Sequence, residues 1–166
     1  MHRAQAAPSG SRVSMDPLRV PKRRAEIEVT FVDGSVRKVA VFLAEQASRH
    51  GGEERVRDLL ESSAGFVPGI DREGDNVAFL AKESIAVVRT DEPPWERDEV
   101  NLPVEHEVEV RLRGGGVLRG FLSYVLPADA SRPIDYLNGS SRFFTLIEEG
   151  RVALVHKTHV LEVVLR

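Results

Sequence analysis

The stretch Glu26–Phe31, with the sequence EIEVTF, returns 81 residues later as Glu107–Leu112, with the sequence EVEVRL. In both copies apolar residues alternate with charged or polar ones, and this period of two places the apolar side chains on one face of an extended chain. The pattern is typical of a half-buried antiparallel strand. Asp33-Gly34 follows the first copy and Gly114–Gly116 the second. Glycine adopts the backbone angles of a tight turn, so each strand is predicted to enter a hairpin.

Two further blocks continue the repeat to the end of the chain. Like residues at an offset of 77 are Arg55 and Arg132, Asp58 and Asp135, Leu60 and Leu137, Ser63 and Ser140, and Phe66 and Phe143. At an offset of 75 they are Val77 and Val152, Ala78 and Ala153, Lys82 and Lys157, Ile85 and Val160, and Val88 and Val163. The offset shrinks only in segments rich in Gly, Ser, Asp or Glu, where loops tolerate changes of length. The chain is therefore predicted to hold two diverged copies of one small β-rich domain.

We place the two copies at residues 26–90 and 105–166. Residues 91–104 are rich in proline and acidic residues and are predicted to form an extended linker. Residues 1–25 are predicted to be a disordered basic tail, with Met15 as an alternative start of the chain. The predicted fold class is mainly β, with two tandem small curved antiparallel sheets. Each is expected to resemble a half-barrel and to carry one short helix between strands two and three.

The helices are predicted from their end signals. The first is expected over Glu53–Ser63, with Val56, Leu59 and Leu60 on its inward face. The second is expected to begin with Ser131 as N-cap and to end at Gly139.

Each predicted domain is too small to be comfortable alone, because units of about 60 residues bury only about 60% of their unfolded surface. The closing strand at Val160–Leu165 is apolar on both faces. We therefore expect its outer side chains, Leu161 and Leu165, to bury against the first unit or against a second copy of the chain.

Composition narrows the function classes. The 166 residues include no cysteine, which excludes disulfides, thiolate zinc sites and thiol catalysis. No apolar run approaches the roughly 18 residues of a membrane span, and no secretion signal is recognisable, so a cytoplasmic location is expected. The net charge of −3 divides into +5 for residues 1–25 and −8 for the rest. Such a basic tail is either a solvated leader or an arm for nucleic acid or another acidic partner.

Two pairs of residues are candidate chemical sites. His156-x-x-His159 is the one histidine pair with a spacing that suits a metal. Residues three apart in a strand point to opposite faces, so only a turn at Lys157–Thr158 would bring the two rings together. Asp58 and Asp135 each follow an arginine by three residues. That spacing favours an ion pair or hydrogen bond that fixes the helix over acid–base catalysis.

The remaining candidates are predicted to be structural. Gly114–Gly116 resembles a phosphate loop only in composition, because a strand and not a helix follows it. His50 and His106 are isolated, and Trp95 in the linker is expected to pack back onto its own domain. We therefore predict no catalytic, cofactor-binding or metal-binding residues and no enzymatic activity.

The second unit resembles a family of small uncharacterised bacterial proteins. The resemblance is carried by Arg132–Asn138 (RPIDYLN), Phe143–Leu146 (FFTL) and Val155–Val160 (VHKTHV). The family pattern reads Arg-x-x-Asp-x-Leu-Asn, then a strand that starts with Phe, then a strand that contains Lys and ends in Ile or Val. The first unit matches less closely, because Glu61 follows Leu60 where the pattern has Asn. The resemblance implies a fold and no activity.

A weaker similarity is to Sm-like β-barrels. Val110-x-Leu112-x-x-Gly115 followed by Gly120-x-Leu122 resembles the first Sm strand pair. An Sm unit has its helix before the first strand, whereas the helix here is expected between strands two and three. The RNA-contacting Asp and Asn of that family also lack counterparts after Gly120. The similarity implies a curved sheet and does not transfer RNA binding.

These observations favour a non-enzymatic bacterial cytoplasmic regulatory or adaptor module that acts by protein–protein interaction without a cofactor. A homo-oligomer is compatible with the sequence, and no membrane partner is expected. One alternative is a nucleic-acid-binding regulator that uses the basic N-terminal arm. A second alternative is a small-molecule sensor or hydrolase with a pocket between the repeats.

Overall fold

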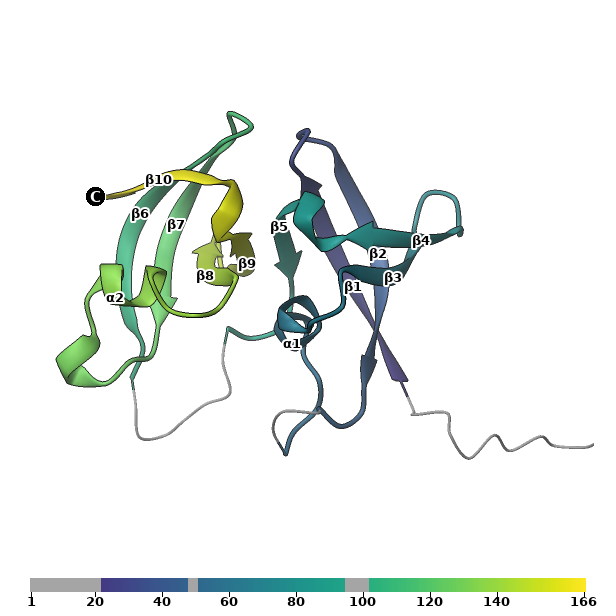
Figure 1. Cartoon of the computed structure of the whole chain (residues 1–166), viewed down its shortest axis with the longest axis horizontal. Helices are drawn as coiled ribbons and strands as arrows, with labels where there is room; N and C mark the ends of the chain where they lie inside the picture. Colours follow the sequence, from purple (N-terminus) through teal and green to yellow (C-terminus); the bar gives the residue numbers. More distant parts are fainter. Residues whose placement is uncertain (1–21, 48–50, 95–101) are drawn as a thin grey trace, which may run out of the picture.

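The structure is a computed structural model that describes residues 22–47, 51–94 and 102–166 (Figure 1). The first half contains β1 (Lys22–Phe31), β2 (Val36–Ala44), α1 (Val56–Glu61), β3 (Phe66–Asp71), β4 (Val77–Ala81) and β5 (Ile85–Thr90). The second half contains β6 (Val104–Leu112), β7 (Val117–Tyr124), α2 (Pro133–Leu137), β8 (Phe143–Glu148), β9 (Arg151–His156) and β10 (Val160–Leu165). Short 3-10 turns lie at Lys82–Ser84, Ala128–Ala130 and Lys157–His159.

In the described residues, ten strands form one antiparallel sheet, in the order β10-β6-β7-β8-β9-β5-β1-β2-β3-β4. The mainly β character is confirmed, and each helix lies between the second and third strands of its half. The prediction of two tandem sheets is wrong. β5 pairs with β9 over Val87–Thr90 and Val152–Val155, and this pairing joins the halves into a continuous sheet. A ladder at this position satisfies main-chain groups that two separate sheets would each leave unpaired.

The two halves arrange their strands in the same way. Each places its fifth strand beside its first, followed by its second, third and fourth. The junction therefore joins the fourth strand of the second half to the fifth strand of the first half. Among the described residues, β4 and β10 have one strand neighbour each and form the two ends of the sheet.

The hydrophobic core is shared between the halves. The first core cluster is built mainly from the first half but also contains Phe143, Val152 and Leu154 of the second half. The second cluster is built mainly from the second half but contains Ala86 and Val87 of β5. Each half thus completes the other's core, which compensates for the small apolar area that a domain of about 60 residues can bury alone.

Both helices are shorter than predicted, and each begins directly after an arginine. The main-chain N–H of Arg55 donates to Asp58 Oδ2 at 2.9 Å, and that of Arg132 donates to Asp135 Oδ2 at 3.3 Å. Helix α2 therefore starts after Arg132 and not after Ser131. A carboxylate three residues inside the helix satisfies the free N–H at its start, which fixes where the helix begins.

The predicted tail, residues 1–25, extends too far, because β1 already begins at Lys22. The pairs Lys22 with Ala44 and Arg23 with Leu43 continue the β1–β2 ladder. Likewise Val104, placed in the linker, belongs to β6. The rest of the tail, Met15, His50 and Trp95 lie outside the described residues.

The closing strands of the two halves differ in burial. β5 is buried on both faces because Ile85 and Val88 pack in the first core cluster and Ala86 and Val87 in the second. In β10, Leu161 is 68% exposed and Leu165 is 56% exposed. The expectation that these leucines bury against the first half of the same chain is therefore wrong, because β9 and not β10 occupies the place beside β5.

Replacing Leu154 by Ala tests the shared core. Leu154 is buried in β9 and packs in the first core cluster. The truncation should lower the free energy of unfolding by about 2–5 kcal/mol, in a single transition measured by circular dichroism in urea. The exposed Val36 on β2 provides a control, since Val36→Ala should change stability by no more than about 0.5 kcal/mol. Two separate transitions, of which only one shifts, would show that the halves unfold independently.

Candidate functional site

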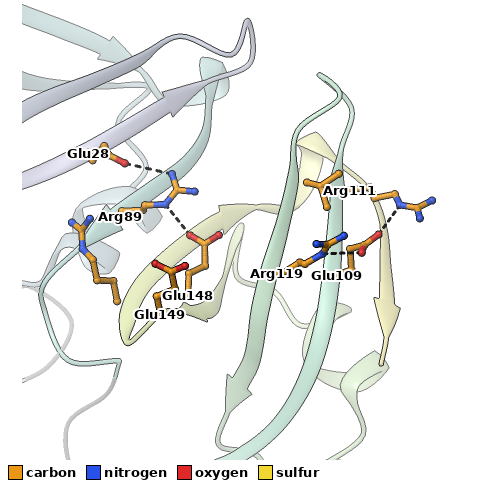
Figure 2. Close-up of a pocket in the computed structure, with 9 residues that line it drawn as sticks. Glu28, Arg89, Glu109, Arg111, Arg119, Glu148 and Glu149 are labelled. Carbon is orange, nitrogen blue, oxygen red and sulfur yellow. Dashed lines mark hydrogen bonds and ion pairs between the residues drawn. The ribbon is translucent and has the colours of Figure 1, made fainter.

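A charged hollow of about 710 Å³ lies where the two halves meet. Its lining includes Glu28 of β1 and Arg89 of β5 from the first half. The second half contributes residues of β6 to β9 and of the turn that joins β8 to β9, namely Glu109, Arg111, Val117, Arg119, Glu148, Glu149 and Arg151. Val117 is the one uncharged lining residue. Figure 2 shows one charged group around Arg89 and another around Glu109.

The group around Arg89 connects the two halves. Arg89 Nε donates to Glu148 Oε2 at 2.8 Å, and its Nη1 lies 3.7 Å from Glu28 Oε1 and donates to Thr30 Oγ1 at 3.1 Å. Nearby, Arg151 Nε donates to Asp91 Oδ1 at 3.0 Å. The ion pairs Arg89–Glu148 and Arg151–Asp91 therefore connect the second half with β5 and with the residue that follows it.

The second group surrounds a nearly buried carboxylate. Glu109 is only 4% exposed and accepts hydrogen bonds from Arg166 at 2.6 Å, Arg111 at 3.1 Å and Arg119 at 3.2 Å. Those hydrogen bonds, the one from Arg166 above all, hold the pKa of Glu109 at about 2. Both the carboxylate and its arginines are therefore charged at neutral pH.

This arrangement suits recognition more than proton transfer. A general acid or base works best with a pKa near the operating pH, and Glu109 lies far below that range. Four arginines and four glutamates line the hollow. Such fixed charges of both signs can contact a polar segment of another chain that carries complementary charges.

The 3-10 turn at Lys157–His159 does bring the two histidines of the candidate metal pair together. The rings of His156 and His159 lie edge to face with centroids 4.8 Å apart. Each ring contacts a main-chain carbonyl of the first half: His156 Nδ1 lies 3.0 Å from Ile85 O and His159 Nε2 lies 2.6 Å from Glu83 O. Within the described ranges, no group of three or more His, Asp or Glu side chains could hold a metal ion. The pair thus connects the second half to β5 of the first half and to the 3-10 turn that precedes β5.

The other described candidate residues make contacts within their own half. Arg132 Nε donates to Asp135 Oδ2 at 2.8 Å, which lowers the pKa of Asp135. Gly115, with φ of 92°, forms the β6–β7 turn. His106 stacks on Tyr124 at 6.1 Å between ring centroids.

The alternation in Glu107–Leu112 places Glu109 and Arg111 on one charged face of a strand, but it does not indicate the hollow. The register of the predicted hairpin could have paired Glu109 with Arg119, which are opposite one another in β6 and β7. Nothing local connects Glu109 with Arg166, because that contact depends on the pairing of β10 with β6.

Comparison of the chain with models of protein families, with curated proteins and with solved structures finds no match. In the part of the chain that the structure describes, neither the length nor the apolar character of any helix reaches what a membrane span requires.

Glu109→Gln should lower the free energy of unfolding at neutral pH, because the amide loses the charge that three arginines share. The folded pKa of about 2 lies below the unfolded value of 4.5. The contribution of the Glu109 charge to the free energy of unfolding is therefore complete above pH 4.5 and is lost as the pH falls toward 2. The gap between wild type and variant, measured by urea unfolding across this range, should close at low pH. Glu107→Gln, at an exposed position of the same strand, is the control. A gap that does not depend on pH would contradict the charge-based account.

His156 should affect the free energy of unfolding in a different pH range from Glu109. Burial lowers its pKa below 6.5, and the neutral ring donates from Nδ1 to Ile85 O. Because the unfolded chain then binds the proton more readily, stability should fall as the pH drops below 6.5. His156→Asn should flatten that slope, whereas His106→Asn should leave it unchanged. An equally steep slope in the His156 variant would contradict this assignment.

Proposed function

We propose that this chain is a non-enzymatic adaptor that binds other protein chains at the ends of its ten-stranded sheet. The observation that carries the proposal is an apolar trio, Phe66, Val77 and Phe79, which are 61%, 68% and 70% exposed. The β3–β4 register and the period of two place all three on one face of this hairpin. Large apolar side chains gathered at the outer edge of β4 favour a protein-binding surface.

Strand addition is the binding mode that the ends of the sheet favour. The outer main-chain groups of β4 and β10 can form a ladder with another strand, as β5 does with β9. Alternate side chains then supply specificity. At the β10 end these are the exposed Leu161 and Leu165. A cysteine-free chain with two such ends fits a regulatory role in the bacterial cytoplasm.

The charged hollow favours a second candidate, a sensor of a polar small molecule. Its volume of about 710 Å³ lies within the roughly 300–1,000 Å³ of ligand sites. Such sites are mostly apolar, whereas eight of the nine lining residues here are charged. The hollow therefore ranks behind the apolar ends of the sheet. The nucleic-acid alternative depends on the N-terminal arm, most of which lies outside the described residues.

Replacing Phe66 and Phe79 together by Lys tests the proposed function. Both side chains are exposed, so the fold should persist while the apolar contact is lost. Burial of one such side chain is worth about 1.5–3 kcal/mol, so partner affinity should fall at least about tenfold. The measurement is affinity capture from the source cells followed by quantitative mass spectrometry.

The matched control is Val36→Lys, an exposed position on β2 away from both ends. Partners recovered by wild type and by this control, but not by the double variant, are the expected result. Recovery of the same proteins in the same amounts by all three would refute the proposed binding surface.

A further inference from the structure

The ends of the sheet are repeats of the two strands that form the junction inside the chain. β9 and β4 are the fourth strands of their halves, and β5 and β10 are the fifth strands. β9 pairs with β5 within the chain, whereas β4 and β10 remain at opposite ends of the sheet. The β9–β5 pairing therefore shows that the fourth strand of one half can pair with the fifth strand of another half. β4 and β10 are strands of these two kinds.

The apolar trio has buried counterparts in the second half. By the repeat, Phe66, Val77 and Phe79 correspond to Phe143, Val152 and Leu154. These three are 1%, 6% and 3% exposed because they cross the junction and complete the core of the first half. Equivalent positions are thus buried where a neighbouring half is present and exposed where it is absent.

The site that receives such a trio is filled in the first half and open in the second. In the first half, Leu60, Val67, Ile85 and Val88 share one core cluster with Phe143, Val152 and Leu154, and Lys82 is buried as well. Their counterparts in the second half, Leu137, Phe144, Lys157, Val160 and Val163, line an open pocket of about 190 Å³. This apolar pocket lies beside β10 and is the equivalent of the space that Phe143, Val152 and Leu154 occupy at the junction.

We propose that copies of this chain assemble head to tail, with β4 of one copy paired to β10 of the next. The apolar trio of the first copy then fills the open pocket of the second. This inference rests on the proposed function and names the partner at the ends of the sheet as a second copy of the chain.

The junction inside the chain also gives the register of the contact. There Val88 lies opposite Leu154 and Thr90 lies opposite Val152. Transferred through the repeat, the pairs are Val163 with Phe79 and Leu165 with Val77. Each pair joins two apolar side chains, and the exposure of Val77, Phe79 and Leu165 in the single chain is then explained.

The polar contacts of the β5–β9 junction have only partial counterparts at the proposed contact between copies. Glu61 accepts the main-chain N–H groups of Arg142 at 3.0 Å and Phe143 at 2.8 Å. Its counterpart Asn138 also carries an acceptor oxygen. The pair Arg89–Glu148 has no equivalent, because the counterpart of Glu148 is the acidic Asp71 but the counterpart of Arg89 is the apolar Val164. The contact between copies therefore depends mainly on apolar burial.

Since β4 and β10 are different surfaces, an open assembly of any number of copies still has one free β4 and one free β10. Contacts of this kind close into a ring when the rotation between copies permits and otherwise extend as a filament. A two-fold dimer, by contrast, would use the same surface on both copies.

The test uses the purified full-length chain and two variants that each disable one end. Phe79→Lys places a charge in the β4 contact, and Leu165→Lys places one in the β10 contact. Light scattering after size-exclusion chromatography should give wild type a mass of several copies and each variant the 18.4 kDa of one copy. An equimolar mixture of the variants should give about twice 18.4 kDa, because one intact end of each kind remains.

Circular dichroism checks that each variant is folded, and Val77→Lys is a second way to disable the β4 end. Val36→Lys is the control that should assemble as wild type does. A wild-type mass of one copy at every concentration up to about 1 mM would overturn the inference. So would assembly that survives either single variant, because a symmetric contact uses only one of the two ends.

The outcome separates this inference from the proposed function. A monomeric wild-type chain whose cellular partners are lost in the Phe66/Phe79 double variant overturns self-assembly and supports the adaptor function. Assembly of the pure protein without loss of any partner supports self-assembly and overturns the adaptor function.

Discussion

The structure depends on the pairing of β5 with β9. Four residue pairs, from Val87 with Val155 to Thr90 with Val152, connect the halves through main-chain hydrogen bonds. The same pairing places Leu154 in one core and Val87 in the other. Because a chain segment of about 60 residues buries little apolar surface alone, neither core is complete without this contact. The junction thus makes one folded unit of two small ones.

Polar contacts around the junction determine how the halves are oriented. Glu61 holds the start of β8, Arg89 pairs with Glu148, and His156 contacts the carbonyl of Ile85. Surface ion pairs contribute only about 0–1 kcal/mol each, so apolar burial supplies most of the stability. The polar groups are directional, and they fix a single register where apolar packing alone would accept several.

The two halves show how one sequence pattern acquires two roles. Phe143 completes a core, whereas its counterpart Phe66 lies exposed at the end of the sheet. No difference in side-chain chemistry separates these positions, since both are phenylalanine at the start of a third strand. The presence of a neighbouring half is what differs. An exposed residue that has a buried counterpart therefore indicates a contact surface more specifically than exposure alone.

The sequence by itself determined the features that short-range patterns encode. Alternation in Glu26–Phe31 and Glu107–Leu112 predicts strands, Gly34 and Gly115 predict the turns, and the repeat places a helix after the second strand of each half. Which strand edges meet was decided by the tertiary structure alone, so two sheets were predicted where one exists. For the same reason Leu161 and Leu165 of β10 are exposed and do not bury against the first half. The contact between Glu109 and Arg166 and the meeting of His156 with Ile85 depend on the same long-range choice. The physical reason is that periodicity specifies which face of a strand is apolar, whereas every strand edge offers the same main-chain donors and acceptors. Only the fit of side chains across an assembled junction distinguishes one edge from another.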